Sequence, residues 1–187
     1  MNTDKVESLT RVVTKLTDNR WMNLFSVVDP TMHCKGFQFA QRRGKDSIAF
    51  ICLDLSIGTR LDDKCYLLNN EFLPPTGEFL TRAFGGSLDK DGYALEDIVK
   101  EELKEEVGFD EGRIIPAGKC FVSSMMDQYC HLFLVLVDKA KCGVRDPQNG
   151  IEALATPVWV SAREILAGND WKAITIISKI NAMNVQI

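Results

Sequence analysis

Short runs in which apolar and polar residues alternate fill the first half of the chain, and they predict strands. GFQFAQRR, DSIAFICLDL and CYLLNNEFL are three such runs separated by turn-forming residues, and we expect them to form an antiparallel meander. Before them, residues 4 to 17 place apolar side chains at helical spacing, and the next run, WMNLFSVVDP, has the composition of a strand. The chain is therefore expected to begin with an N-terminal helix or arm.

Helical spacing returns between about Ala94 and Val107, and Gly108 follows in the position of a C-terminal cap. RIIPAGKCFVSS and QYCHLFLVLVDKA then predict two strands, of which the second is apolar enough to lie at the centre of a sheet. A polar loop leads to a short strand, ATPVWVS, a short helix, SAREILAG, and a last helix that Asp170 can cap. We predict one mixed α/β (α+β) fold, with residues 1–36 as a helix/strand arm and residues 37–187 as one globular unit.

Composition places the chain among soluble globular proteins. Of its 187 residues, 45% are hydrophobic and 26% are charged. A net charge of −4 provides no basic field for nucleic acid, which is therefore a disfavoured partner. No apolar run reaches membrane-spanning length and the start lacks the pattern of a cleaved leader, so we expect a cytoplasmic protein with no membrane partner. Most of the cysteines lie in apolar runs, which is typical of reduced, buried thiols.

The helix that ends before Gly108 is unusually acidic. Glu101 and Glu105, and likewise Glu102 and Glu106, stand four residues apart, so like charges lie on neighbouring turns and oppose helix formation. A hard divalent cation bound by these carboxylates, with the phosphates of a substrate on its far side, is the simplest compensation. A merely solvated acidic helix is the alternative.

The segment from Gly85 to Phe109 resembles the Nudix box, G-x5-E-x7-R-E-U-x-E-E-x-G-U, in which U is apolar. The second half of the box matches at Glu102, Leu103, Glu105, Glu106, Gly108 and Phe109. The first half departs from the pattern, because one residue is inserted after Gly86 and because Tyr93 and Glu101 occupy the places of a glutamate and an arginine. In the family, those two residues support the metal ligands.

Two segments before the box resemble the ADP-ribose pyrophosphatase and nucleoside-diphosphate-sugar hydrolase branch of this family. In NEFLPPTGEFLTRAFGGSLD, Arg82 stands where the branch carries a glutamate beside the metal, and a cation there either repels a metal or contacts a phosphate. WMNLFSVVDPTMHCKGFQFAQRR resembles the N-terminal strands that surround the adenine in that branch. By this alignment Trp21, Phe37 and Arg42 bind the base, with core packing as the alternative for the two aromatic residues.

The resemblance implies a Nudix fold, in which a mixed β-sheet is sandwiched between helices and preceded by N-terminal antiparallel strands. It also implies hydrolysis of the diphosphate linkage of ADP-ribose or of a related nucleoside diphosphate sugar, with Mg²⁺ or Mn²⁺ as the cofactor. The metal ligands would be Glu102, Glu105, Glu106 and the main-chain carbonyl of Gly85. Proteins of this branch commonly form dimers, so the resemblance also implies a homodimer.

The residue that takes the proton from the attacking water is a glutamate in this branch, on the loop before the last strand. Glu152 is the only glutamate in the corresponding loop here. Asp146 competes with it for this role, and a solvated loop carboxylate is the alternative for Glu152. Glu105, beside the metal ligands, is the second residue with an implied catalytic role. A different interpretation, motivated by the departures at three positions noted above, is a Nudix-fold module that binds a nucleotide without cleaving it.

Overall fold

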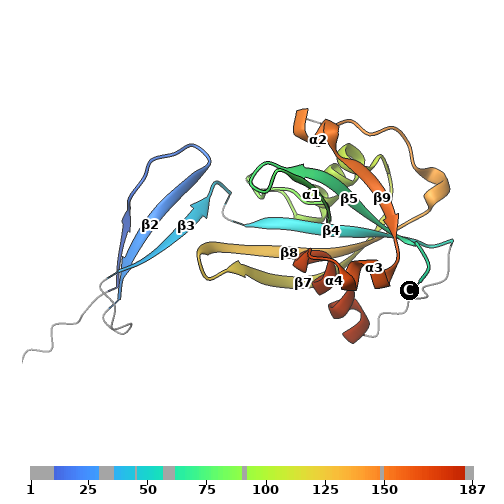
Figure 1. Cartoon of the computed structure of the whole chain (residues 1–187). Coiled ribbons are helices and arrows are strands. Elements are labelled where there is room, and N and C mark those ends of the chain that lie inside the picture. The colour runs from blue at the N-terminus through green and yellow to red at the C-terminus, as the bar shows by residue number, and fades with distance from the viewer. Residues whose placement is uncertain are drawn as a thin grey trace, which may run out of the picture.

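Two parallel strands, β4 (Ser47–Asp54) and β8 (Met126–Val137), form the centre of a mixed sheet (Figure 1). The computed structural model describes residues 11–29, 36–44, 46–56, 62–89, 92–147 and 150–183, without the side chains of residues 151 and 152. All eight residues of β4 are buried, because both faces of this strand are covered. The prediction that the run QYCHLFLVLVDKA lies centrally in the sheet is confirmed by the pairing of β8 with strands on both of its edges.

The other strands extend the sheet from this pair. They are β1 (Val12–Lys15), β2 (Met22–Val28), β3 (Phe37–Arg42), β5 (Tyr66–Leu73), β6 (Glu78–Arg82), β7 (Arg113–Ser123) and β9 (Thr156–Val160). The order is β1-β2-β3-β8-β4-β5-β6, with β7 paired to β8 and β9 paired to β5. The predicted meander is correct for β4 and β5, which are antiparallel, but wrong for β3 and β4, which each pair with β8 in parallel. Alternation identifies a strand, whereas its neighbour here comes from a distant part of the chain.

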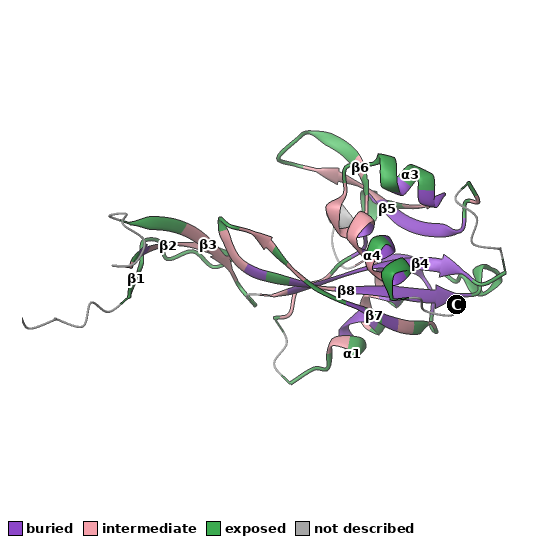
Figure 2. Cartoon of the chain, turned by 90° about the horizontal axis from the view of Figure 1, so that it is seen from below, coloured by how far each residue is buried: buried purple, intermediate pink, exposed green. Residues whose placement is uncertain are grey.

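Side chains of β4 alternate between two apolar layers. Ile48 and Phe50 pack in the layer beneath α1 (Leu95–Glu102), and Ala49 and Ile51 pack in the layer beneath the C-terminal helices. Those helices are α3 (Ala162–Ala167) and α4 (Trp171–Ala182). Figure 2 shows β4, most of β8 and part of β5 in purple, the colour of buried residues. The sheet is thus sandwiched between helices, as predicted.

The acidic helix changes character before it ends. After α1 it continues as a π-helix, η2 (Leu103–Val107), whereas the sequence predicted one regular helix from about Ala94 to Val107. Gly108 ends it with φ of 90°, in the left-handed region, and its amide donates to the carbonyls of Leu103 and Lys104. The predicted C-terminal cap at Gly108 is confirmed.

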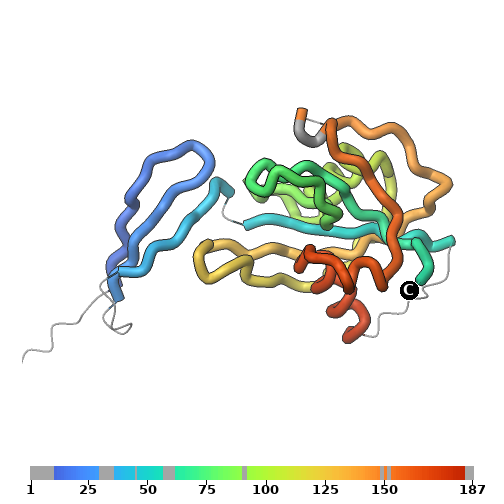
Figure 3. Tube along the Cα trace, in the orientation of Figure 1, coloured from blue at the N-terminus to red at the C-terminus, as the bar shows by residue number. Residues whose placement is uncertain are grey.

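Strands β1, β2 and β3 form an antiparallel arm that extends away from the rest of the sheet (Figures 1 and 3). The helix expected over residues 4 to 17 is wrong from residue 12 onward, because Val12–Lys15 pair with β2, and residues 4 to 10 lie outside the described ranges. Helical spacing of the apolar residues was misleading here. Consecutive β-branched residues at 12 to 14 favour a strand when a neighbouring strand edge can pair with them.

The C-terminal part follows the sequence expectations closely. Asp170 caps α4 by accepting from the amide of Ala173 at 3.2 Å. The preceding polar loop contains two short helices, η3 (Lys139–Lys141) and α2 (Gly150–Leu154). Five cysteines in the described ranges are free thiols, and burial raises the pKa of Cys130. Within those same ranges, no helix combines the length and apolar character needed to cross a bilayer.

Replacing Ser161 by alanine should lower the free energy of unfolding by about 1 kcal/mol. Ser161 and Glu164 form a capping box at the start of α3, in which the Ser161 amide donates to Glu164 Oε2 at 2.7 Å and the hydroxyl donates at 2.8 Å. These bonds lower the pKa of Glu164, so their contribution is present above the unfolded pKa and is lost as the pH falls through the folded pKa. The destabilisation measured by urea unfolding should therefore be smaller at pH 3 than at pH 7.

Ser178→Ala is the matched control for this prediction. Ser178 is exposed within α4, and its hydroxyl donates only to the carbonyl of Ile174 at 2.8 Å. Its removal should change the free energy of unfolding by less than about 0.5 kcal/mol. Equal losses at the two positions would contradict a special role for the Ser161 cap.

Candidate functional site

A cavity of about 270 Å³ lies where the glycine turn of residues 85–86 meets the start of β4, the end of η2 and the first turn of α4. We call it the central cavity. Its charged lining side chains are Arg42, Glu71, Arg82, Glu106 and Lys172. Three cations and two carboxylates around a small, half-open space suit a ligand that carries negative charge, particularly phosphate oxygens.

The glycine turn forms one wall because it runs beside β4 like a short strand. The carbonyls of Phe84 and Gly86 accept from the amides of Phe50 and Ile48, at 3.0 and 2.9 Å. Successive carbonyls of an extended chain point in opposite directions, so the carbonyl of Gly85 points away from β4. Gly85 lines the cavity. Its carbonyl is therefore placed to serve as an oxygen ligand.

Gly86 brings the turn close to the acidic helix. A Cβ atom on residue 86 would lie 2.2 Å from Glu102 Oε1 and 2.8 Å from its carboxyl carbon. Only glycine permits this approach without displacing the Glu102 carboxylate. Glu102 is half-buried beside the turn, and Glu106, which is 7% exposed, reaches the cavity itself. Both glutamates therefore lie close to the glycine turn.

Glu105 lies between these two glutamates in sequence, but it does not line the cavity. It is half-buried, and its main-chain carbonyl accepts from the amide of Asp146 at 3.0 Å. Arg145 makes a parallel connection, because its Nε donates to the carbonyl of Glu106 at 2.6 Å and its Nη1 to the carbonyl of Ala155 at 2.7 Å. These bonds fasten the end of the acidic helix to the loop that precedes β9.

Arg82 is held by a second charged residue of the cavity. Its Nη1 lies 2.6 Å from Glu71 Oε1, and the two side chains are 29% and 27% exposed. Glu71 and Arg82 are diagonal neighbours across the β5–β6 pair, in which Asn69 lies directly opposite Arg82. The ion pair with Glu71 holds the Arg82 guanidinium in the cavity, where its remaining N–H groups can donate hydrogen bonds to a ligand.

Arg42 joins the arm to the cavity. It is the last residue of β3, it lines the cavity, and it donates a hydrogen bond to the hydroxyl of Ser87 in the glycine turn. Trp21 and Phe37, the two aromatic residues expected beside it, are not brought together. Met22 pairs with Arg42 and Val27 pairs with Phe37, so the two aromatic residues lie at opposite ends of the hairpin, roughly 20 Å apart.

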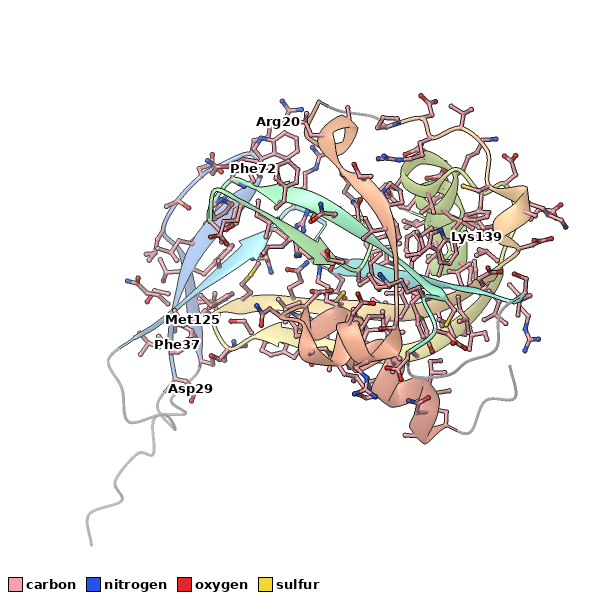
Figure 4. The ribbon with its side chains drawn as sticks, turned by 45° about the vertical axis from the view of Figure 1, so that its right-hand side comes forward. Arg20, Asp29, Phe37, Phe72, Met125 and Lys139 are labelled. Carbon is pink, nitrogen blue, oxygen red and sulfur yellow. The ribbon has the colours of Figure 1, made fainter. Side chains whose placement is uncertain are left out.

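Figure 4 shows this separation, with Arg20, the residue before Trp21, far from Phe37. Trp21 is 61% exposed and Phe37 is 38% exposed, so neither belongs to the apolar core. Stacking of one base between both rings of the same chain does not fit this arrangement.

Lys172 is a cavity residue that the sequence did not indicate. It lies in the first turn of α4, and the carboxylate of Asp170 fixes this turn by accepting from the amide of Ala83 at 2.8 Å as well as from Ala173. The cap therefore anchors α4 to the chain that leads into the glycine turn. A lysine after a helix cap is an ordinary local pattern, so only the docking of α4 reveals its position.

Glu152, the expected proton acceptor, belongs to α2, but its side chain lies outside what the structure describes. Its competitor Asp146 is exposed, and its amide is bound to Glu105 as stated above. Both residues therefore lie on the loop segment that is fastened to the acidic helix. The assignment of the proton acceptor stays a prediction.

Oxygen ligands for a divalent cation are present at the cavity. In the described ranges, no three His, Cys, Asp or Glu residues are arranged as a ready metal site. Magnesium, however, is commonly held by one or two carboxylates, with water and substrate phosphates completing its shell. Glu106 in the cavity, Glu102 against Gly86 and the carbonyl of Gly85 fit that kind of ligand set.

Comparison with known proteins establishes the fold. No family model and no curated protein matches the sequence. Among solved structures, a crystal structure of an ADP compounds hydrolase is similar, with a TM-score of 0.64 and 15% identity over 92% of this chain and 94% of that one. The chain is therefore similar in fold to an ADP compounds hydrolase. The likeness confirms the predicted mixed α+β fold, and at 15% identity it shows the fold alone.

Proposed function

We propose that this protein is a metal-dependent Nudix hydrolase that cleaves the diphosphate linkage of ADP-ribose or of a related nucleoside diphosphate sugar. The products would be a nucleoside monophosphate and a sugar phosphate. The observation that carries the proposal is the central cavity, which joins Glu106 and the Gly85 turn to Arg42, Arg82 and Lys172. Hydrolysis of a diphosphate requires a metal ion, held by carboxylates, on one side of the phosphates and cationic side chains on the other.

Glu102, Glu106 and the carbonyl of Gly85 would hold Mg²⁺ or Mn²⁺, with Glu105 beside them. Such an ion would neutralise the diphosphate and lower the pKa of a bound water. Glu106 can act from a fixed position, because η2 is buried along one side and Arg145 holds the carbonyl of Glu106. Glu102 lies against Gly86, where the absence of a Cβ leaves room for its carboxylate.

The three cationic residues of the cavity would contact the phosphates in different ways. Arg42 and Lys172 approach the cavity from the arm and from α4, that is, from different elements of the fold. Arg82, compensated by Glu71, contributes a directed hydrogen bond and little net charge. Proton removal from the attacking water is assigned to Glu152, with Asp146 as the second candidate on the same loop.

The homodimer is proposed on the exposure of the arm. Large apolar side chains other than Trp21 are exposed on β1 and β2 and beside them, namely Val12, Val13, Leu16, Met22 and Val28. A second copy of the chain that covers the arm would remove this surface from water. Sedimentation velocity, compared between the full chain and a Val12→Ser, Val28→Ser variant, would test it.

Incubation with a substrate panel tests the proposed function. The panel contains ADP-ribose, ADP-glucose, GDP-mannose, UDP-glucose and diadenosine diphosphate, each with Mg²⁺ or Mn²⁺, and release of nucleoside monophosphate is measured by chromatography. We expect turnover of at least one nucleoside diphosphate sugar and none in the presence of a chelator. Monophosphate release identifies cleavage within the diphosphate.

The same panel separates the enzyme from a binding module. If no compound is cleaved while ADP-ribose still raises the melting temperature, the protein binds the nucleotide without cleaving it, and the hydrolase proposal is wrong. The intact glutamates Glu102, Glu105 and Glu106 favour the enzyme, because bare glutamates beside a phosphate site repel the ligand unless a cation lies between them.

A further inference from the structure

A second recess lies where the arm joins the body of the protein. It has a volume of about 450 Å³ and is lined by Arg20, Asn23, Gln41, Arg42, Arg43 and Gly44. We call it the arginine recess. Its lining contains three guanidinium groups and no carboxylate. In a chain with a net charge of −4, this is a local concentration of positive charge that the overall composition does not explain.

The pairing of β2 with β3 creates the recess. Met22 pairs with Arg42, and the amide of Arg43 donates to the carbonyl of Trp21 at 2.8 Å. Arg20, just before β2, and Arg43, just after β3, therefore lie at the same end of the hairpin although they are far apart in sequence. Figure 4 shows Arg20 at that end, on the side of the arm where Phe72 of β5 also lies.

Within the part of the chain that the structure describes, no carboxylate forms an ion pair with any of these three guanidinium groups. Arg20 lies over the ring of Trp21, 4.7 Å from its centroid, and Arg42 donates to the hydroxyl of Ser87. Like charges gathered without a counter-charge oppose one another, and an anion with several oxygen atoms would offset this cost.

The neutral amides of the recess already have partners. Asn23 Nδ2 donates to the carbonyl of Asn19 at 2.9 Å, and Gln41 Nε2 donates to Asp127 Oδ2 at 2.9 Å. These bonds fix the walls of the recess and leave the guanidinium groups as the donors for a ligand. A phosphate accepts several such charge-assisted bonds, whereas an uncharged sugar or base would leave the charges uncompensated.

Arg42 lines both the arginine recess and the central cavity. A single ligand can therefore place its diphosphate in the cavity and another anionic group in the recess. Trp21, 61% exposed and adjacent to the recess, offers a ring face for a base at the same end of the arm. The group that lies between a base and a diphosphate in a nucleotide is the ribose.

We infer that the arginine recess binds a phosphomonoester on the ribose of the nucleotide. The preferred substrates are then nucleoside diphosphate compounds that carry a further phosphate at the 2′ or 3′ position. The part of this inference that concerns substrate preference in hydrolysis rests on the proposed function. The recess itself is a binding site whether or not hydrolysis occurs.

Matched substrate pairs that differ by one phosphate test the inference. We would measure kcat/KM for ADP-ribose 2′-phosphate against ADP-ribose, for NADPH against NADH, and for coenzyme A against 3′-dephospho-coenzyme A. The phosphorylated member of at least one pair should be preferred by about tenfold or more, mainly through a lower KM. Equal values within every pair, in a protein that hydrolyses them, would overturn the inference and leave the proposed function standing.

Arg43→Gln and Arg20→Gln should each bring the preference for the phosphorylated member close to one. Arg113→Gln is the control, because Arg113 is an exposed arginine of β7 that lines neither site. The control should keep the full preference. If the preference survives in both recess variants, another part of the protein recognises the phosphate and the inference is wrong.

A binding experiment separates the recess from catalysis. Calorimetry with adenosine 2′,5′-bisphosphate, adenosine 3′,5′-bisphosphate and AMP requires no hydrolysis. Tighter binding of one bisphosphate, lost in Arg43→Gln, supports the recess even if the substrate panel shows no turnover. Equal affinity for the three nucleotides, unchanged by that substitution, overturns it. The difference should shrink as salt is added, because the recess contacts are exposed.

Discussion

Replacing Glu106 by glutamine should lower kcat roughly 10³-fold for whichever nucleoside diphosphate compound the protein cleaves. Glu106 is 7% exposed and lines the central cavity at the end of η2. Glutamine keeps the size of the side chain and removes its charge, so the loss reflects the charge that holds a cation. The main-chain bond from Arg145 to the carbonyl of residue 106 does not depend on that charge. Circular dichroism and thermal unfolding should show a folded variant.

Glu96→Gln is the control for this change. Glu96 is an exposed residue of the first turn of α1 and does not line the cavity. The substitution removes the same charge from the same helix and should leave kcat within about twofold of the original. Full activity in Glu106→Gln would contradict the metal assignment. An equal loss in both variants would show that the charge of the helix, and not a carboxylate in the cavity, is what matters.

The sequence predicted most of the helices and strands, but it predicted fewer of the pairings between strands. Alternation located β4 and β8 because each is a continuous apolar run, and Gly108 marked the end of the acidic helix because a left-handed residue favours glycine. The sequence did not predict that β3 pairs with β8, because β8 lies far along the chain. It also failed at Val12–Lys15, where pairing with β2 overrides helical spacing.

For the site, the structure brings some of the residues indicated by motifs to one cavity, and packing adds others that the motifs do not indicate. Arg42, the segment from Arg82 to Gly85, and Glu106 come from three parts of the chain and line that cavity. Glu71 became part of the site only through its ion pair with Arg82, and Lys172 only through the docking of α4. Both depend on contacts between distant elements, about which a local pattern carries no information.

The aromatic residues show a different limit of the sequence. An alignment to N-terminal strands predicted that Trp21 and Phe37 bind one base, but register decides which side chains meet on a hairpin. With Val27 opposite Phe37 and Met22 opposite Arg42, the residue close to Trp21 is Arg43, whose amide binds the Trp21 carbonyl. The cation that contacts the exposed Trp21 ring is the guanidinium of Arg20, 4.7 Å from the ring centroid. This neighbour and the other arginines of the recess are what suggest an anionic group on the nucleotide.

Replacing Gly108 by alanine should produce the largest loss of stability, about 3 kcal/mol, which corresponds to a fall in Tm of roughly 10 °C. Two costs add at this position. The φ of 90° is unfavourable for any residue with a Cβ, and that Cβ would lie 2.8 Å from the carbonyl oxygen of Gly143. The loop cannot simply retreat, because the amide of Gly143 donates to the carbonyl of Gly108 at 2.8 Å.

Gly77→Ala separates the two costs, because Gly77 has a similar φ of 72° but open space around its Cβ position. Gly77→Ala should lower the free energy of unfolding by about 1 kcal/mol, which is the cost of the backbone conformation alone. Urea unfolding of both variants gives the difference, which is the contribution of the contact between Gly108 and Gly143. Equal losses would show that the loop relaxes without cost. Because the same loop carries Arg145 and Asp146, which bind the carbonyls of Glu106 and Glu105, Gly108→Ala should also reduce kcat, whereas Gly77→Ala should not.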